Sequence, residues 1–364
     1  MDKKVHASFL LLQCLPAEED KHRRKANMRY LGSKNLMTNR ILEVIETNTD
    51  NAISVTDIFS GTGVVAKTLK SHGFSVIAND LLYFSYALNK GLLETNKPLS
   101  RKMHELIEHL NNLPTDCNSL DYSKAFIYNN YSPHDGCNRM YFQNSNALKI
   151  DAIRQEIDKL RPELHENEYF YLLACLINAV PYVANITGTY AAYLKYWDKR
   201  TYNSIKLDEE PIIASKRQHH CYNMDAFELA KIVTSDIVYL DPPYNQRQYL
   251  PNYHILETIA KYDYPEIKGV TGIRTDPHKQ SVFCKKAIAA DSFKKLLNQL
   301  KCKYILISYN NEGIINTEQL TEIVFSIGIP KTFKLFEYDY RLYKSKIPNT
   351  KEGLKEQLYF IQKS

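Results

Sequence analysis

The sequence predicts an α/β fold, with helices on both faces of a largely parallel sheet and an insertion between two parts of the sheet. Residues 52–80 read as strand, glycine turn, helix and strand. Apolar, strand-like segments recur at 235–241 and 303–309. A strand–helix–strand unit favours parallel pairing, and such sheets bind ligands at the carboxyl ends of their strands.

The first unit is preceded by a helix. Residues 35–48 carry apolar side chains at helical spacing, and 52–59 (AISVTDIF) is an apolar strand. Residues 64–72 resume a helix that Gly73 ends, and 74–80 (FSVIAND) forms the second strand. The order of these segments places a glycine-rich turn between the first strand and its helix.

The middle of the chain differs from both flanks. It is polar and rich in Asn, Tyr and His, and only 151–161 and 166–179 show clear helical character. We interpret it as an insertion into the α/β domain. The predicted division is an N-terminal extension at 1–27, a catalytic domain at 28–100 and 222–364, and an insertion at 101–221.

The last part returns to sheet and helix. Residues 235–241 (SDIVYLD) and 303–309 (KYILISY) predict buried strands, and 252–262 predicts a helix between them. Residues 331–343 and 356–363 predict a terminal antiparallel pair.

Composition sets the broad class. The 364 residues carry a net charge of +6 and are 44% hydrophobic, which is ordinary for a globular protein. No run of 18 apolar residues occurs, and the apolar patch at 9–12 is too short for a signal peptide. The seven cysteines form no CxxC pair, which predicts reduced thiols and no metal site. We expect a cytoplasmic protein without a membrane segment.

The glycine turn is the first candidate ligand site. Asp57 ends the strand, and Gly61 and Gly63 allow a tight turn and close approach of a ligand to the backbone. Asp80 ends the next strand, where a carboxylate accepts both hydroxyls of a cofactor ribose. The string GTGVVA fits a dinucleotide-binding pattern only in its alanine variant, so this motif alone leaves NAD open.

The string DPPY at 241–244 points to chemistry on an amine. The prolines fix the chain and present the Asp241 carboxylate and the Pro242 carbonyl as two rigid acceptors, and Tyr244 adds a stacking face. Two acceptors and a ring suit a planar exocyclic amine such as adenine N6. Accepting its hydrogens frees the nitrogen lone pair, and the carboxylate stabilises the positive charge that develops on methylation.

These motifs together resemble a known family. DPPY after a strand, D-x-F-x-G-x-G before it and YLGSK at 30–34 are similar to Dam-like DNA adenine-N6 methyltransferases. Longer strings resemble above all the methylases of type II and IIS restriction–modification systems: ANDLLYFSYALN, DPPYNQRQYLPNYHILETIAKYD, GVTGIR and YILISYNNEG. The resemblance covers 28–100 and 222–364. It implies a Rossmann-like methyltransferase fold dependent on S-adenosyl-L-methionine, with a mixed seven-stranded sheet and a target-recognition insertion.

The resemblance also implies roles for individual residues. Tyr30 and Lys34 would contact the methionine portion of the cofactor, Lys34 through the carboxylate. Asp80 would hold the ribose and Asp225 the cofactor adenine. The remaining cofactor contacts would come from Asp57, Phe59, Gly61, Gly63 and Asp241, and the amine site from Asp241, Pro242 and Tyr244.

A duplex substrate adds further demands. The target adenine must be flipped out of the stack, and basic surface must hold phosphates. Basic residues gather at 21–40 and 268–304. Beside the motifs, the expected DNA contacts are Arg247, Tyr249, Tyr253 and Arg274.

The expected function is therefore site-specific methylation of adenine N6 in double-stranded DNA by a monomer, with a cognate restriction endonuclease as functional partner. Three alternatives stay open: an RNA adenine-N6 methyltransferase, a cytosine-N4 methyltransferase, which Asp241 argues against, and a DNA-binding module without catalysis.

Overall fold

A computed structural model describes residues 30–115, 120–276, 280–339 and 353–364. The expected extension at 1–27 lies outside the described residues. So do the basic side chains before residue 30, Lys279, and the end of the strand expected at 331–343. Within the described ranges, no helix is long and apolar enough to cross a membrane.

One seven-stranded sheet forms the centre of the α/β part, as the sequence predicts. Its strands lie in the order β3-β2-β1-β4-β7-β9-β8, and only β9 runs against its neighbours. The bounds are β3 His220–Tyr222, β2 Ser75–Asn79, β1 Ser54–Asp57, β4 Ser235–Leu240, β7 Cys302–Asn310, β9 Lys355–Gln362 and β8 Lys334–Asp339.

Helices cover both faces of this sheet because the central strands are apolar on both sides. Ile237 and Tyr239 pack with α1 (Thr38–Asn48) and α2 (Val64–Ser71). The alternate residues of β4 face the other layer, which consists of α8 (Ala226–Ile232), α10 (Ala289–Gln299) and α11 (Thr317–Phe325). Because successive side chains of a strand point to opposite faces, β4 contributes side chains to two hydrophobic cores.

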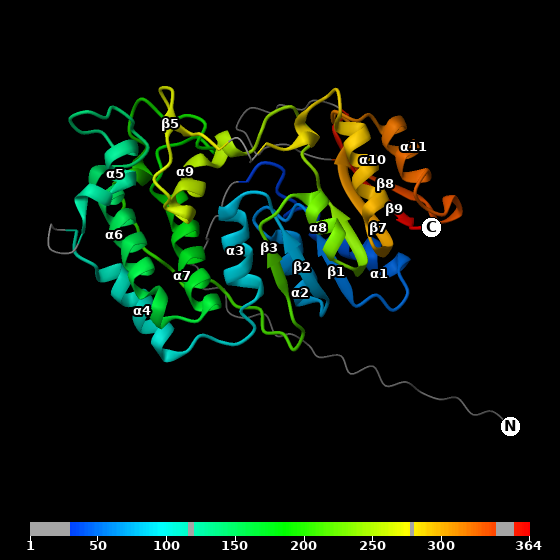
Figure 1. Ribbon diagram of the computed structural model, residues 1–364, viewed down its shortest axis with the longest axis horizontal. Coiled ribbons are helices and arrows are strands. Elements are labelled where there is room, and N and C mark those ends of the chain that lie inside the picture. Colours follow the sequence, from blue (N-terminus) through cyan, green and yellow to red (C-terminus); the bar gives the residue numbers. More distant parts are fainter. Residues whose placement is uncertain (1–29, 116–119, 277–279, 340–352) are drawn as a thin grey trace.

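A helical lobe stands beside the sheet (Figure 1). Its main helices are α4 Arg101–Asn112, α5 Phe126–Tyr131, α6 Asn144–Leu160 and α7 Glu166–Ala179. Two helices from outside the insertion complete its core: α3 (Tyr83–Leu93) and α9 (Leu250–Lys261). The lobe and the sheet are therefore joined through α3 and α9, which lie outside the expected insertion at 101–221.

A small hairpin follows α9. Its strands are β5 (Ile267–Lys268) and β6 (Ile273–Arg274), and they pair antiparallel. Figure 1 places the hairpin at the top of the lobe, next to α5 and α9.

Candidate active site

A cleft opens at the carboxyl ends of β1, β2 and β4, where a parallel sheet places its ligands. Its lining comes from six separate segments: the N-terminal loop, residues 58–59 after β1, the end of β2, the loop after β3, the loop after β4, and residues 281–283. Residues of the lining include Tyr30, Phe59, Asp80, Asp225, Asp241 and Tyr249.

The glycine turn is fixed by the carboxylate that follows the next strand. Gly61 and Gly63 have φ values of 50° and 74°, which side chains rarely adopt. Asp80 accepts hydrogen bonds from the Gly61 N–H at 2.9 Å and the Leu82 N–H at 2.8 Å. Each of its oxygens thus has one backbone donor, and the carboxylate still faces the cleft.

Asn79 ties three strand ends together, a role for which the sequence offered no signal beyond its place before Asp80. Its amide donates to the carbonyls of Ile58 and Met224, both at 3.1 Å, and accepts from the Met224 N–H at 3.2 Å. These bonds hold the loop after β3 against the end of β1. Asp225, in that loop, begins α8 by accepting from the Phe227 N–H at 2.8 Å.

One wall of the cleft is apolar. Phe59 meets Phe283 edge-on, with ring centroids 5.3 Å apart, and Met224 lines the same wall. Gln248 and Ser281 exchange two amide hydrogen bonds, which fasten the segment of Phe283 to the loop after β4. In the sequence this segment stands out only as part of a basic stretch, and no motif marks Met224 or Phe283.

The DPPY loop directly follows β4. Asp241 and Pro243 line the cleft, whereas Pro242 is buried beneath it. Tyr244 packs edge-on against Tyr309 and lies under the Lys34 ammonium, 5.4 Å from the ring centroid. Burial raises the pKa of the Asp241 carboxyl to about 6, although the adjacent Lys34 acts to lower it.

Lys34 lies beside the carboxylate of the DPPY loop. Its ammonium lies 2.9 Å from Asp241, 3.0 Å from Glu356 and 3.3 Å from the Gly32 carbonyl. The ammonium thus forms ion pairs with two carboxylates and hydrogen-bonds one backbone carbonyl. The ammonium therefore lies at the expected amine site and is not part of the cleft lining, and its contact with the cofactor carboxylate stays a prediction. Glu356 lies more than three hundred residues away in the chain, and no sequence motif around it predicts its place beside Lys34.

The N-terminal loop is held by stacked tyrosines. Tyr30 stacks on Tyr253 at 4.8 Å, and its ring contacts the position that a Gly61 side chain would occupy. Tyr253 is buried, and its hydroxyl accepts from the Leu31 N–H at 2.7 Å. Tyr253 is thus part of the loop support and not the DNA contact that we expected. Tyr249 lines the cleft and stays a candidate.

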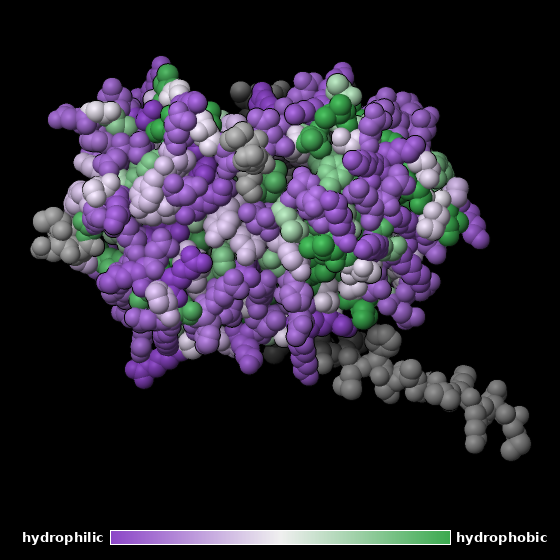
Figure 2. All heavy atoms as spheres, in the orientation of Figure 1, coloured by the Kyte–Doolittle hydropathy of each residue, from purple (hydrophilic) through white to green (hydrophobic). Residues whose placement is uncertain are grey.

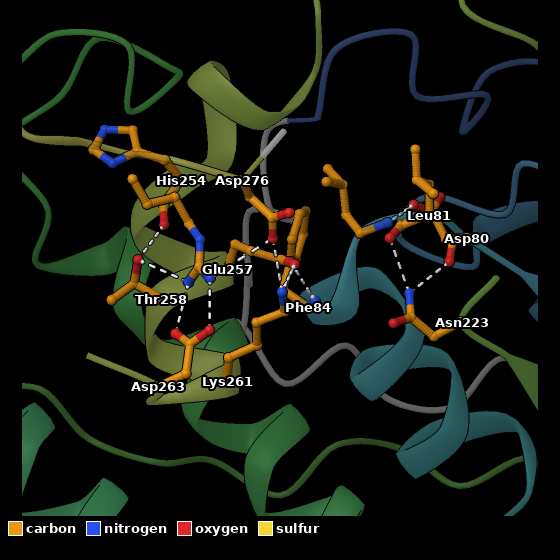
Figure 3. Close-up of polar contacts among 12 residues, drawn as sticks. Asp80, Leu81, Phe84, Asn223, His254, Glu257, Thr258, Lys261, Asp263 and Asp276 are labelled. Carbon is orange, nitrogen blue, oxygen red and sulfur yellow. Dashed lines mark hydrogen bonds and ion pairs between the residues drawn. The ribbon is translucent and has the colours of Figure 1, made fainter. Parts of the chain in front are cut away.

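Arg274 is a second correction. Its side chain is buried, and its guanidinium makes two hydrogen bonds to Asp263, at 3.0 and 2.7 Å. Figure 3 shows Asp263, Thr258, Lys261 and Asp276 gathered at this point of α9 and the hairpin. A guanidinium held in this way cannot reach DNA, so its role is structural. Arg247 is exposed, as a DNA contact would be.

Asp57 lies below the cleft and is not part of its lining. It is almost fully buried at the end of β1. Burial, and then the charges of Asp241 and Asp80, raise the pKa of Asp57 well above its usual range, which favours the uncharged form. The expected cofactor contact through Asp57 is therefore not supported.

Sequence comparison decides the family. The sequence pattern of the D12 class N6 adenine-specific DNA methyltransferases matches residues 30–323. The chain belongs to this family. The match confirms the resemblance inferred from DPPY and the glycine motif.

Three relatives illustrate the relationship. The type II methyltransferase M.FokI of Planomicrobium okeanokoites is 42% identical over 92% of this chain, and the modification methylase StsI of Streptococcus sanguinis is 37% identical over 92%. The chain spans about half of each, 53% and 52%. The type II methyltransferase M.NlaIII of Neisseria lactamica is 35% identical over 87% of this chain and 93% of its own length.

Proposed function

We propose that this D12-class chain transfers a methyl group from S-adenosyl-L-methionine to N6 of adenine in double-stranded DNA at a specific site. The observation that carries the proposal is the juxtaposition of Asp241 with the cleft that Asp80 and Phe59 line. A carboxylate for the amine and a site for a nucleoside cofactor thus lie side by side. The names of M.FokI, StsI and M.NlaIII support the activity.

The side chains of the cleft fit a positively charged nucleoside better than a dinucleotide. Among the described lining residues there are three carboxylates, on Asp80, Asp225 and Asp241, and no Lys, Arg or His. A pyrophosphate would meet three negative charges there, whereas a sulfonium would be attracted. This charge pattern favours S-adenosyl-L-methionine over NAD. Asp80 would hold its ribose, and Asp225, Phe59 and Met224 its adenine.

Bound S-adenosyl-L-methionine supplies an electrophilic methyl group, and the protein prepares the amine. The Asp241 carboxylate accepts a hydrogen of the target N6 and stabilises the positive charge that develops on it. Tyr244 offers a ring on which the flipped base can stack. The rigid loop after β4 holds both groups in place, so that positioning supplies much of the rate enhancement.

We further propose that the helical lobe, which is built largely from 101–221, reads the DNA sequence, with Arg247 and Tyr249 as contacts near the target. A cognate restriction endonuclease would be the functional partner. The monomeric state and the cytoplasmic location remain predictions.

The decisive experiment incubates the purified protein with methyl-labelled S-adenosyl-L-methionine and genomic duplex DNA, and identifies the labelled nucleoside by mass spectrometry. We expect N6-methyladenine. Asp241→Asn should lower the rate by roughly 10²–10³-fold, whereas Asp291→Asn, an exposed acid on α10, should not. Labelled N4-methylcytosine, a preference for RNA, or cofactor binding without transfer would each contradict the proposal.

A further inference from the structure

A buried carboxylate on β9 contacts the lysine beside the amine site. Glu356 lies near the start of β9 and is 2% exposed. Its Oε1 atom is 3.0 Å from the Lys34 ammonium and accepts a hydrogen bond from the Ser308 hydroxyl at 2.7 Å. Lys34 in turn is 2.9 Å from Asp241. The three charged side chains form a chain from β9 to the cleft.

We propose that Glu356 is a positioning residue of methyl transfer, which holds Lys34 on Asp241 and keeps the net charge of the amine site negative. The inference rests on the proposed function. It adds a residue that touches neither the amine nor the cofactor and acts through Lys34.

The charges of the cluster explain why Glu356 is needed beside the Lys34–Asp241 pair. Lys34 beside Asp241 fixes the carboxylate, but the two charges cancel, and a neutral pair would do little for a positive charge developing on nitrogen. With Glu356 the cluster carries one net negative charge. In a buried site such a charge acts strongly over a few ångströms. A buried ammonium is costly unless acceptors and opposite charges surround it, and Glu356 supplies one such carboxylate to Lys34.

Several other groups surround Asp241. Asp57 faces it from the end of β1, but its burial favours the uncharged form. Tyr239 on β4 and Tyr249 before α9 are also close enough for charge interaction. Tyrosines are neutral in the physiological range. The charge balance at Asp241 is therefore set by Lys34, which lowers its pKa, and Glu356, which raises it.

The test is Glu356→Gln, which retains the acceptor oxygen for Lys34 and Ser308 but removes the charge. Glu337→Gln, an exposed acid on the neighbouring strand β8, is the matched control. At pH 8, where Asp241 is ionised, we expect kcat to fall about tenfold, with the affinities for S-adenosyl-L-methionine and DNA unchanged. The acid limb of the kcat–pH profile should also move to lower pH, because a charge that raised the pKa of Asp241 is gone.

A structural role would give a different result. Loss of thermal stability with an unchanged kcat and pH profile would overturn the inference, and so would a defect confined to cofactor or DNA affinity. A titration of the free enzyme by ¹³C-carboxyl NMR, with the Asp241 signal assigned by its loss in Asp241→Asn, should show the same shift without turnover. Inactive wild-type protein would instead refute the proposed function, which separates the two failures.

Discussion

The pKa of the Asp241 carboxyl is set by opposing effects of its surroundings. Burial raises its pKa to about 6, and Glu356 adds to the rise, while Lys34 opposes both. In the proposed reaction, this carboxylate accepts a hydrogen from the amine in its ionised form. Its ionisation state therefore links the pH of the solution to the chemistry of the cleft.

The first prediction concerns this pH dependence. As the pH falls through about 6, Asp241 takes up a proton and methyl transfer should decline, because the acceptor is lost. The kcat of the wild-type protein measured between pH 5 and 9 should show an acid limb centred near 6. A limb near the pKa of a free carboxyl would show that burial has little effect on Asp241.

The same shift predicts the stability of Asp241→Asn. A folded-state pKa above the unfolded value means that burying the ionised group opposes folding at pH values above both. Asn keeps an acceptor for Lys34 without the charge. We expect the free energy of unfolding at pH 8 to rise by about 1–3 kcal/mol, as measured by urea denaturation. A variant less stable than wild type would show that the ion pair with Lys34 outweighs burial.

Lys34 gives a prediction of opposite sign to that of Glu356. Although burial alone would lower it, the charges of Asp241 and Glu356 raise the pKa of Lys34 well above its usual range, so the ammonium stays charged. Lys34→Met should move the acid limb of the kcat–pH profile to higher pH. Cofactor affinity, measured by calorimetry, should change little, since the Lys34 ammonium is buried between Asp241 and Glu356 and does not line the cleft. A large loss of cofactor affinity would restore the original expectation for this residue.

At the scale of single elements, the turn between β1 and α2 is the most constrained. A side chain at Gly63 would meet the Asn89 amide oxygen at 2.1 Å, and the same amide donates to the Ser60 hydroxyl and the Gly61 carbonyl. The turn therefore combines a left-handed residue with a neighbour that cannot move without breaking its own bonds.

Gly63→Ala should consequently destabilise the protein more than Gly73→Ala does. Gly73 has φ +84° but nothing within 4 Å, so its substitution costs only backbone strain, about 1–2 kcal/mol. The clash at Gly63 adds to that strain and displaces the turn, so cofactor affinity should fall as well. Thermal denaturation and cofactor titration of the two variants measure both effects. Equal losses of stability would mean that Asn89 readily gives way.

The hairpin after α9 is held at both ends. Arg274 anchors its base to Asp263, and the Tyr131 hydroxyl donates to the Gly272 carbonyl at 2.8 Å. Arg139 bonds the carbonyls of Gly269 and Val270 at the tip. These contacts fix the orientation of the hairpin on the lobe.

Arg274→Gln should therefore reduce stability by about 1–3 kcal/mol, because the buried side chain loses its charged hydrogen bonds to Asp263, which is itself partly exposed. It should leave the salt dependence of DNA binding unaltered at a temperature where the variant is folded. Arg247→Gln should do the reverse: stability is unchanged, and the slope of log affinity against log salt falls by about 1. A change of that slope in the Arg274 variant would return this residue to the DNA contacts.

An element was predictable from the sequence where its residues form a recognisable local pattern. Helix α7 begins and ends as expected at 166–179, because Glu168 bonds back to the His165 N–H and marks its start. Helix α3 was missed because it packs into the core on nearly all sides and so shows no polar face. The motif residues Asp80 and Asp241 follow strands directly, so their placement in one cleft was predictable. Glu356 depends on long-range strand pairing, which no local pattern encodes.

At the scale of the whole molecule, the sheet and the helical lobe stand side by side, and both contribute to one continuous body (Figure 1). The face shown in Figure 2 is largely hydrophilic, with scattered hydrophobic residues. The net charge of +6 is modest for a protein proposed to bind a polyanion. Any contribution of charge to DNA binding must therefore depend on where the positive side chains lie on the surface.

DNA binding should accordingly weaken with salt. Between 50 and 200 mM salt we expect the affinity for duplex DNA to fall by about a hundredfold or more, as for proteins that contact several phosphates. Fluorescence anisotropy with a labelled duplex measures it. An affinity independent of salt would mean that phosphate contacts contribute little to binding.

The position of β9 has a consequence for the time at which activity arises during synthesis. Lys34 leaves the ribosome more than three hundred residues before Glu356, roughly 15–60 s earlier at common rates of translation. Until β9 is inserted between β7 and β8, the lysine has no second carboxylate, and the sheet that carries the cleft is incomplete. The amine site is thus assembled from both ends of the described chain, and we expect the proposed methyl transfer to be slow until β9 is in place.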